Sequence, residues 1–474
     1  CISGGSVADL AIEGAITGRS YVGGITGYLE NGVIENCTND SSVFANSTYA
    51  GGAAGYMQDS LITDCENNGH VHINPEGKYD AGGIVGCAVL TENAGADKLI
   101  LSNCRNSGNV CCGSTENDEC TGGIVGTARG LSDVSGELVY HVVIEDCANS
   151  GAVINCEDGT GGIVGYMETG MIRGCSNDGS VTGVNGVGGI AGYVYFDSMV
   201  SDCVNIGTVT ASRQYVGGIA GNSYALYDYA ENVIENCVNN GDVNSGFTSE
   251  LQDSYDCTEG TYEDLKEGEI YYNDPTGGCA GGVAGALWLS AFTNTPGYNG
   301  GSVSVTGCTN SGSVINEASA TTGGIAGYVF NGLVDPSCVN TGAVSGMTGD
   351  TSTGDVIGYL FLTNNFVDTS GISKNIIIGG TNADTAAVLY GEAYCITLTA
   401  KSGYSLGKVV VKMGGVNITD DAFRGSTVQI HKVTGNLVIR AAASYEGGTD
   451  HGSSGVNEGS PLLPVTLTRS ENGS

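Results

Sequence analysis

Apolar and polar residues alternate along most of the chain in a motif that returns many times. An Ile, Leu or Val is followed three residues later by Cys, and this Cys opens the run Cys-x-Asn-x-Gly-x-Val. The motif cysteines are Cys37, Cys65, Cys104, Cys147, Cys175, Cys203, Cys237, Cys308 and Cys338. Alternation with a period of two predicts short strands, and recurrence along the chain predicts a repeat architecture.

A second element, Gly-Gly-apolar-x-Gly, precedes each copy of the motif, as in Gly161-Gly162-Ile163-Val164-Gly165. Its closest copies lie 27–31 residues apart, which suits one coil of short strands and turns. Frequent Gly and alternating β-branched residues disfavour helices. We therefore predict an all-β chain whose residues 1–360 form a parallel β-solenoid (β-helix) with insertions. About ten coils would make a rod roughly 45–50 Å long.

Stacked coils place equivalent residues in columns, and these columns predict the core. The residue three before the motif Cys, such as Ile172, forms one apolar column, and the motif Val, such as Val181, forms another. The ninth copy departs from this pattern because Asp335 fills the apolar slot, between Val334 and Pro336. We expect a kink or a slip of register at that point.

The motif Asn is expected to form a ladder, in which stacked amides hydrogen-bond along the rod axis. Asn also tolerates the turn that leads to the motif Gly. The first copy alone has Ser41 in the Gly slot. Because every coil carries the Asn equally, the ladder predicts a structural and not a catalytic role. The ladder residues are Asn39, Asn67, Asn106, Asn149, Asn177, Asn205, Asn239, Asn310 and Asn340.

The two elements together resemble the GLUG repeat of bacterial surface proteins, over about residues 15–360. The resemblance rests on Gly161-Gly162-Ile163-Val164-Gly165-Tyr166 followed by Ile172-x-x-Cys175-x-Asn177-x-Gly179-x-Val181 and its other copies. Such proteins include adhesins and the non-catalytic regions of immunoglobulin-A-cleaving metallopeptidases. The resemblance implies an extracellular or cell-surface setting and no catalysis by the repeats. The metallopeptidase motif His-Glu-x-x-His is absent from the sequence.

Residues 376–443 have a different pattern, with alternation in Tyr394–Ala400 and Val409–Met413 and a Gly414-Gly415 turn. This predicts a small β-sandwich. The run Ala400-Lys401-Ser402-Gly403-Tyr404 and the later Val433-Thr434-Gly435-Asn436-Leu437 resemble the immunoglobulin-like or internalin-B-type repeats of Gram-positive surface proteins. Residues 444–474 are rich in Gly, Ser, Glu and Asn and are predicted to be a linker or tail.

The formal net charge of −35 excludes two classes of partner. Nearly all of it lies in residues 1–355, so the solenoid should repel the phosphates of nucleic acids and anionic membranes. No apolar run reaches about 18 residues, so we expect no membrane insertion. Residues 10–16 look like half of a degenerate repeat, so the start is interpreted as a cut through a longer protein. A lipoprotein N-terminus at Cys1 is the alternative.

Insertions between coils are the predicted place of binding, because inserts project from a solenoid. The largest, residues 244–280, contains an acidic segment with four tyrosines, and a second at 286–300 contains the only Trp. Exposed aromatic residues beside carboxylates suit contact with a carbohydrate or a protein. Plain loop elaboration is the alternative. The candidate binding residues are Trp288, Phe292, Tyr298, Tyr255, Tyr262, Tyr271 and Tyr272.

Cysteine chemistry is predicted to differ between the repeat and the inserts. The column cysteines should be buried thiols, since nine stacked equivalents cannot all pair. The other cysteines are better candidates for disulfides. We expect one bond within Cys112–Cys120 or from Cys111 or Cys112 to Cys156, and another between Cys257 and Cys279.

No metal or catalytic site is specified. His70 and His72 would lie on one face of a strand, but no third ligand is identifiable, and an exposed polar strand is the preferred interpretation. Calcium could bind among Asp253, Asp256 and Asp274. The abundant acidic residues define no catalytic pair, so no enzyme activity, no catalytic residue and no cofactor other than calcium is predicted.

These observations favour an extracellular bacterial surface protein. In this hypothesis the solenoid is a stalk or adhesin region that displays loops for binding a host protein or glycan. The alternative is the catalytic or non-catalytic β-helix part of a secreted glycan-degrading enzyme or peptidase. The oligomeric state and the ligand stay open at this point.

Overall fold

The computed structural model describes most of the solenoid and part of the C-terminal region. The described residues are 1–74, 80–92, 99–112, 120–131, 142–155, 158–225, 230–246, 278–289, 302–317, 321–330, 332–346, 353–361, 363–366, 374–377, 393–399, 404–413, 416–433, 437–445 and 466–468.

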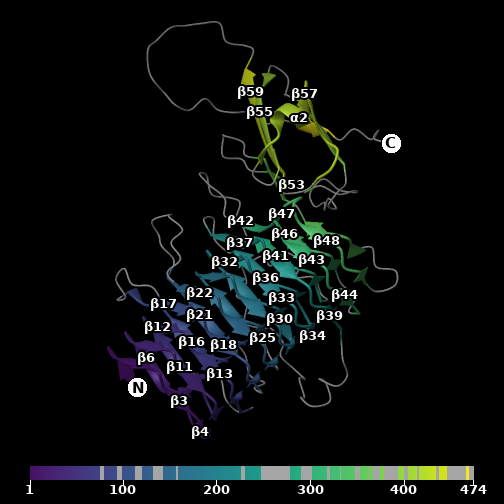
Figure 1. Ribbon diagram of the computed structural model, residues 1–474. Helices are drawn as coiled ribbons and strands as arrows, with labels where there is room; N and C mark the ends of the chain where they lie inside the picture. The colour runs from purple at the N-terminus through teal and green to yellow at the C-terminus, as the bar shows by residue number, and fades with distance from the viewer. Residues whose placement is uncertain are drawn as a thin grey trace, which may run out of the picture.

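The repeat region is a parallel β-solenoid, which confirms the predicted fold class (Figure 1). Each coil contributes one strand to each of five parallel sheets, which we name A to E in the order in which the chain visits them. Sheet A has 11 strands, and sheets B to E have 10 each. The described strands therefore form ten coils, from β1 (Ile2–Ser3) to β50 (Thr353–Gly354), and one further sheet A strand.

Sheets A and B are the first two sheets that the chain enters in each coil. Sheet A consists of β1, β6 (Thr26–Glu30), β11 (Ala54–Gln58), β16 (Val85–Val89), β21 (Val125–Arg129), β26 (Val164–Glu168), β31 (Ala191–Tyr195), β36 (Ala220–Ala225), β41 (Ala284–Leu289), β46 (Ala326–Phe330) and β51 (Ile357–Phe361). Sheet B consists of β2 (Ser6–Ala8), β7 (Val33–Glu35), β12 (Leu61–Thr63), β17 (Leu99–Ser102), β22 (Val142–Glu145), β27 (Met171–Arg173), β32 (Met199–Ser201), β37 (Glu231–Glu235), β42 (Ser302–Thr306) and β47 (Leu333–Val334).

The remaining three sheets complete each coil. Sheet C has two-residue strands, from β3 (Ala11–Ile12) to β48 (Val339–Asn340). Sheet D has strands of two to four residues, from β4 (Ala15–Gly18) to β49 (Val344–Ser345). Sheet E runs from β5 (Val22–Gly23) to β50 and carries the Gly-Gly element at its junction with sheet A.

The coil interior is divided into two apolar cores. The larger core contains inward residues of sheets A and B together with the motif cysteines, for example Ile144, Met167 and Cys175. The smaller core lies between sheets D and E and contains the motif valines, for example Val181 and Val187. The predicted apolar columns are confirmed, since the motif valines and the residues three before Cys are buried from the second coil to the ninth.

The wall between the two cores is made of the Asn ladder and the paired glycines. A Cβ atom at Gly162 would collide with the Gly189 carbonyl oxygen of the next coil and with the Asn177 amide. The second glycine of each pair is therefore required by the close approach of a buried amide, and not by a positive φ. The motif Asn and the preceding Gly-Gly element, which are distant in sequence, form one contact.

The predicted Asn ladder is confirmed from Asn39 to Asn340. Each Nδ2 donates to the Oδ1 of the next coil at 2.7–2.8 Å, as between Asn149 and Asn177, and also to the backbone carbonyl two residues later. The ladder thus has a direction, and the Oδ1 of Asn39 has no amide donor from the first coil, where Ile12 occupies the slot. The Ser41 hydroxyl and amide donate to this Oδ1 instead, which explains the single exception in the motif.

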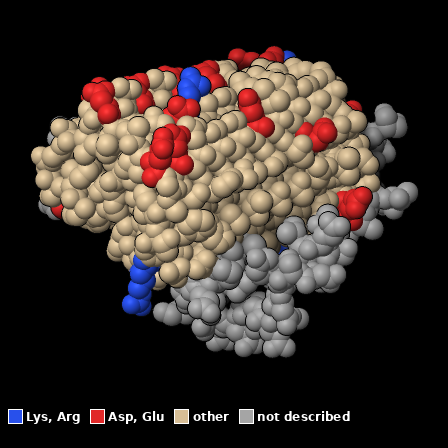
Figure 2. Space-filling model, turned by 60° about the horizontal axis from the view of Figure 1, so that its bottom comes forward, with Lys and Arg blue, Asp and Glu red and all other residues tan. Residues whose placement is uncertain are grey.

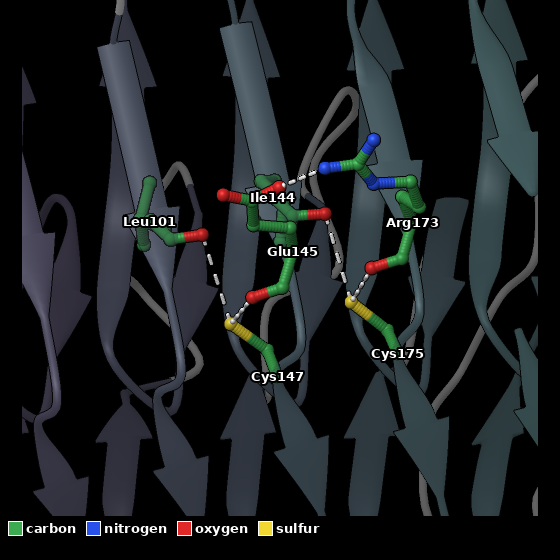
Figure 3. A network of polar contacts seen from close by, with 6 residues as sticks. All are labelled: Leu101, Ile144, Glu145, Cys147, Arg173 and Cys175. Carbon is green, nitrogen blue, oxygen red and sulfur yellow. Dashed lines mark hydrogen bonds and ion pairs between the residues drawn. The ribbon is translucent and has the colours of Figure 1, made fainter.

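The motif cysteines form a second buried column (Figure 3). The Cys147 thiol contacts the carbonyl oxygens of Glu145 at 3.3 Å and of Leu101, in the preceding coil, at 3.8 Å. Cys175 repeats this geometry one coil later, with the carbonyl of Ile144 at 3.6 Å. The hydrogen bond with the Cys104 thiol, followed by burial, raises the pKa of the Cys65 thiol. These side chains are buried structural thiols, as expected.

The predicted disulfide bonds are wrong for the described cysteines. Cys111, Cys112, Cys120 and Cys279 are all thiols, while their possible partners Cys156 and Cys257 lie outside the described residues. Strand alternation explains the error. Cys112 points into the small core, where it lies between Ile73 and Asn155 of the adjacent coils. Cys111, one residue earlier, points outward between His72 and Ile154. The two neighbouring cysteines therefore face opposite sides of the strand.

The irregularity predicted at the ninth motif copy is confirmed. Val334 fills the inward slot and pairs with Val305, so one extra residue separates this slot from Cys338. A turn at Pro336 and Ser337 takes up the difference, and the Asp335 carboxylate accepts hydrogen bonds from the Ser337 amide and hydroxyl.

Acidic residues are kept apart on the outside of the coils. On the face drawn in Figure 2 they form separate groups with uncharged surface between them. The row of residues just before the motif Cys shows this separation. Its residues have a left-handed backbone with φ of 50–62°, which restricts the row to types such as Asp, Asn and Gly that tolerate this conformation. Coil by coil it contains Asp9, Asn36, Asp64, Asn103, Asp146, Gly174, Asp202, Asn236 and Gly307. Within this described row, no two carboxylates are neighbours.

The C-terminal region, where the alternation predicts a small β-sandwich, contains antiparallel sheets. One contains β57 (Phe423–Arg424), β58 (Thr427–Ile430), β54 (Tyr394–Thr399) and β60 (Thr466–Thr468), and another contains β56 (Val416–Asn417), β55 (Tyr404–Met413) and β59 (Leu437–Tyr445). The short helix α2 (Thr419–Ala422) and the pair β52 (Thr363–Phe366) and β53 (Lys374–Ile377) complete the described elements. Strand β60 lies within the predicted tail, so part of that tail joins the sheet. No described helix has the length and hydropathy of a membrane span.

Replacing Asn177 by Ala should destabilise the solenoid by about 1–3 kcal/mol, because the Asn149 amide loses its acceptor and the Asn205 carbonyl oxygen loses its donor. Urea unfolding followed by circular dichroism measures the change. Asp178→Ala, at an exposed position in the same turn, is the control. Equal effects of the two substitutions would contradict a ladder that contributes to stability.

Thiol labelling should separate the two kinds of cysteine. In the native protein, a maleimide should label the exposed Cys1 and the half-buried Cys111, while buried column thiols such as Cys147 should label only in denaturant. Peptide mapping by mass spectrometry identifies each site. Labelling of the column at the rate of Cys111 would show that the coils open readily.

Candidate binding face

The outer face of sheet A differs chemically from the other surfaces of the solenoid. Three rows of side chains run along it. The first outward row contains Tyr28, Tyr56, Cys87, Thr127, Tyr166, Tyr193, Asn222, Ala286 and Tyr328. The second contains Glu30, Gln58, Val89, Arg129, Glu168, Tyr195, Tyr224 and Trp288. The third, the flanking row, precedes the paired sheet E residues and contains Tyr21, Tyr49, Asp80, Cys120, Gly159, Gly186, Tyr215, Cys279 and Thr321.

Four tyrosines form an aromatic cluster at the N-terminal end of this face. Tyr28 and Tyr56 stack with centroids 5.2 Å apart and planes at 8°. Tyr21 and Tyr49 pack beside them, with centroids 5.5 Å apart, and Tyr21 is 45% exposed. The Tyr28 hydroxyl donates to Gln58 Oε1 at 3.1 Å. The cluster therefore combines ring surface with polar atoms at its edge.

A longer aromatic segment crosses the later coils. The Tyr195 ring lies 5.2 Å from Tyr166, 5.3 Å from Tyr193 and 5.4 Å from Tyr224. Tyr224 in turn lies 6.4 Å from Trp288, one coil further along. Glycine in the flanking row makes room for this packing, because a Cβ atom at Gly186 would collide with the Tyr193 ring. The segment is thus a continuous row of contacts across successive coils.

Trp288 belongs to this segment and not to a projecting insert. It lies in β41, is 8% exposed, and packs against Tyr328 with centroids 5.8 Å apart. The insertion predicted at 286–300 includes Trp288, whereas β41 extends to Leu289 and contains it. The other candidate binding residues, Phe292, Tyr298, Tyr255, Tyr262, Tyr271 and Tyr272, lie outside the described residues.

A buried polar segment separates the two aromatic groups. Asp80 is 6% exposed, and its Oδ1 accepts a hydrogen bond from the Cys120 amide at 3.1 Å. Its carboxyl also contacts the side chains of Thr127 and Cys87. Burial raises the pKa of Asp80 to about 7, although these hydrogen bonds and the charge of Arg129 act in the opposite direction. Asp80 therefore titrates near neutral pH.

The thiols beside Asp80 are not activated. Burial, followed by the negative charge of Asp80, raises the pKa of Cys87 and that of Cys120. A thiol with a raised pKa is a poor nucleophile at neutral pH, because the thiolate is the reacting form. The arrangement is thus suited to proton uptake by one carboxyl and not to covalent catalysis by these cysteines.

Arg129 links the polar segment to the longer aromatic segment. Its guanidinium lies 5.5 Å from the Tyr166 ring centroid, and its Nε lies 3.6 Å from Glu168 Oε2. The Arg129 side chain is 58% exposed. An exposed cation over an aromatic ring contributes about 0.5–1 kcal/mol. This contact brings a positive charge to a face whose other charged residues are acidic.

The candidate metal ligands do not converge. His70 is exposed in a turn, and His72 lies half-buried on β14 (Val71–Ile73), where burial lowers its pKa. Within the described ranges, no three His, Cys, Asp or Glu side chains are arranged to hold a metal ion. Asp253, Asp256 and Asp274, suggested for calcium, lie outside those ranges.

Comparison with known proteins finds a known motif in one segment of the chain. Residues 18–43 match the family model described as the GLUG motif, and this segment passes once around the solenoid from sheet E to sheet D. No curated protein matches the chain. A crystal structure of a candidate immunoglobulin A1 protease from Bacteroides ovatus is similar at 15% identity and a TM-score of 0.28, covering 70% of this chain and 78% of that one. A likeness at this TM-score carries no argument here.

The sequence shows the recurring tyrosines of this face, but it does not show which way their side chains point. The residue after Gly-Gly-apolar-x-Gly is Tyr in several copies, as at Tyr28, Tyr56, Tyr166 and Tyr193. Its outward direction follows only from the strand register. The burial of Asp80 was not predictable from its neighbours in sequence, because the groups that contact it, such as Cys120 and Thr127, come from later coils.

Asp80→Asn should change how stability depends on pH. The folded pKa of Asp80 is about 7 and its usual value is 3.8, so the folded protein holds a proton that the unfolded chain has released between these values. The wild type should therefore lose up to about 4 kcal/mol of stability as pH rises from 4 to 7. The variant should lack this loss and be more stable at pH 8. Urea unfolding across this range measures it, with exposed Asp178→Asn as the control. Parallel curves for wild type and Asp80→Asn would contradict a buried carboxyl.

Proposed function

We propose that this chain is the binding and display region of an extracellular bacterial surface protein, with the outer face of sheet A as its ligand-binding surface. The observation that supports this most is the aromatic segment Tyr193, Tyr195, Tyr224 and Trp288, which continues in contact over successive coils. Aromatic side chains are the residues most often responsible for binding energy at protein surfaces. The GLUG motif adds the expectation of a surface or secreted setting.

Aromatic residues at these positions are not needed for folding. The same rows accept Cys87, Thr127 and Asn222 at the first outward position and Val89 at the second, in coils with the same strand register. An amino-acid type that a repeat does not require, but that gathers in consecutive coils, is best explained by contact with a partner. The half-exposed Tyr166, Tyr195 and Tyr224 leave ring surface available for this contact.

The surrounding charge favours a particular class of ligand. Carboxylates such as Glu168 and Glu30 border the rings, and the chain carries a net charge of −35, so an anionic partner would be repelled. Tyrosine rings and hydroxyls suit the apolar faces and hydroxyl groups of a neutral sugar. We therefore favour a neutral host glycan, and a host protein is the second candidate.

We favour binding over turnover as the role of this face. The thiols beside Asp80 have raised pKa values, and the structure offers no activated nucleophile in the described part of this face. A place in a larger secreted glycan-degrading enzyme or peptidase is the alternative, in which the solenoid would hold the substrate. Turnover of a polysaccharide panel by the purified chain would favour that alternative over adhesion.

Tyr195→Ala and Tyr224→Ala should each lower the affinity for a captured glycan by about ten-fold or more, because each ring contributes contact area at the centre of the face. A glycan and host-protein array identifies the ligand, and titration calorimetry measures the affinity. Phe44→Ala removes a 37% exposed ring from sheet D and is the matched control. Unchanged affinity in both tyrosine variants, or an equal loss in the control, would place binding elsewhere on the chain.

A further inference from the structure

Sheet B presents an outward apolar stripe that the function proposed above does not use. The first outward position of this sheet is apolar in seven successive coils. The stripe runs from Val33 to Val233 through Leu61, Ile100, Val143, Met171 and Met199, each paired with the next in parallel register. Ser6 and Ser304 occupy the same position in the coils at either end.

The stripe lies on the surface and not in the core. In β27 the pattern is half-buried Met171, buried Ile172 and exposed Arg173, so Met171 and Arg173 share the outer side. In the other six coils the stripe residue is also half-buried, except Val143, which is 6% exposed, and the residue after it is buried. The stripe residues belong neither to the apolar cores nor to the residues packed against them. A continuous apolar row of this length on a chain of net charge −35 marks an interaction surface.

We propose that this stripe is a dimer interface, on which the sheet B stripe of a second copy of the chain docks side by side. The first reason is spacing. Stripe side chains recur once per coil, at roughly 4.8 Å, over a length of about 29 Å from Val33 to Val233. A helix advances 5.4 Å per turn and would lose this phase within about four coils. Another solenoid of the same repeat keeps the phase along the whole stripe.

The second reason is the neighbouring charge. Beside the stripe, the second outward row of sheet B contains Glu35, Thr63, Ser102, Glu145, Arg173, Ser201, Glu235 and Thr306. Acidic residues in this row are separated by uncharged ones or, at Glu145, paired with Arg173 at 2.5 Å. The row therefore lacks the block of like charge that would prevent a second copy from approaching.

The area limits the strength of this contact. Two faces about 29 Å long and about 10 Å wide would bury on the order of 600 Å² in total, which is less than a stable interface buries. The dimer is therefore weak and forms at high local concentration, as on a crowded cell surface. Because the two copies repel each other electrostatically, salt should strengthen the association.

Sedimentation equilibrium of the 474-residue chain tests this interface. The weight-average mass should rise above the monomer value of 47.9 kDa with concentration, and should rise further at about 0.5 M than at about 0.05 M NaCl. Met171→Glu and Met199→Glu should each raise the dissociation constant by at least about ten-fold. Thr182→Glu and Thr210→Glu add the same charge to the outer side of sheet D in the same coils and should leave it unchanged.

A further variant separates the effect of net charge from the effect of burying a charged group. Met199→Lys lowers the net negative charge, so it should favour association if charge alone governed it, whereas burial of an ammonium group should weaken a dimer formed through the stripe. Circular dichroism confirms that each variant is folded, and only folded variants are compared. A chain that stays monomeric at all concentrations and salt levels would overturn the proposal. So would a dimer that the sheet D substitutions weaken as much as the sheet B ones.

Discussion

Each side chain of this solenoid lies beside its own counterpart, about 4.8 Å away in the next coil, and most of the structure follows from that repetition. A residue type is acceptable at a position only if it can stack on itself or on what replaces it. Ile and Val do so in the cores, and Asn does so by donating from Nδ2 to the next Oδ1. Glycine is needed where the Asn amide meets the backbone, so the ladder and the Gly-Gly element are two sides of one contact. The first Asn of the ladder, Asn39, receives no amide donor from the coil before it, and Ser41, which replaces the motif Gly there, donates to its Oδ1 instead.

The inward positions could be predicted from the sequence because repetition makes them self-consistent. The apolar columns, the Asn ladder, the buried motif thiols and the slip at Asp335 all follow from residue types at fixed spacing. The strands of the C-terminal region also follow from alternation, although their antiparallel pairing was not predicted. In these cases the same residue types recur at the same spacing in every coil, so one copy of the repeat predicts the others.

The outward positions could not be predicted with the same success, for two physical reasons. Insertions of different length separate the coils, so residues that share a row, such as Tyr224 and Trp288, are not equally spaced in sequence. Neighbouring residues on a strand face opposite sides, so Cys112 lies in the small core while Cys120 flanks the outer face of sheet A, and the disulfide expected between them does not form. The aromatic face of sheet A, the buried Asp80 and the stripe on sheet B emerge only when the register is known. Surfaces of this protein are therefore properties of several coils together and of no single repeat.

The row that precedes the motif Cys has a consequence for how such a chain can lengthen. In Asp9, Asn36, Asp64, Asn103 and Asp146 a carboxylate alternates with an amide. Copying a single Asp-bearing coil next to itself would place two exposed carboxylates one above the other, which is unfavourable. Copying two coils together would keep the alternation and the amide-to-carboxylate hydrogen bond seen between Asn36 and Asp9. In this alternating part of the row, an Asp-bearing coil can be duplicated without electrostatic cost only together with its Asn-bearing neighbour. The unit of duplication is then a pair of coils, twice the length of the motif that defines the repeat.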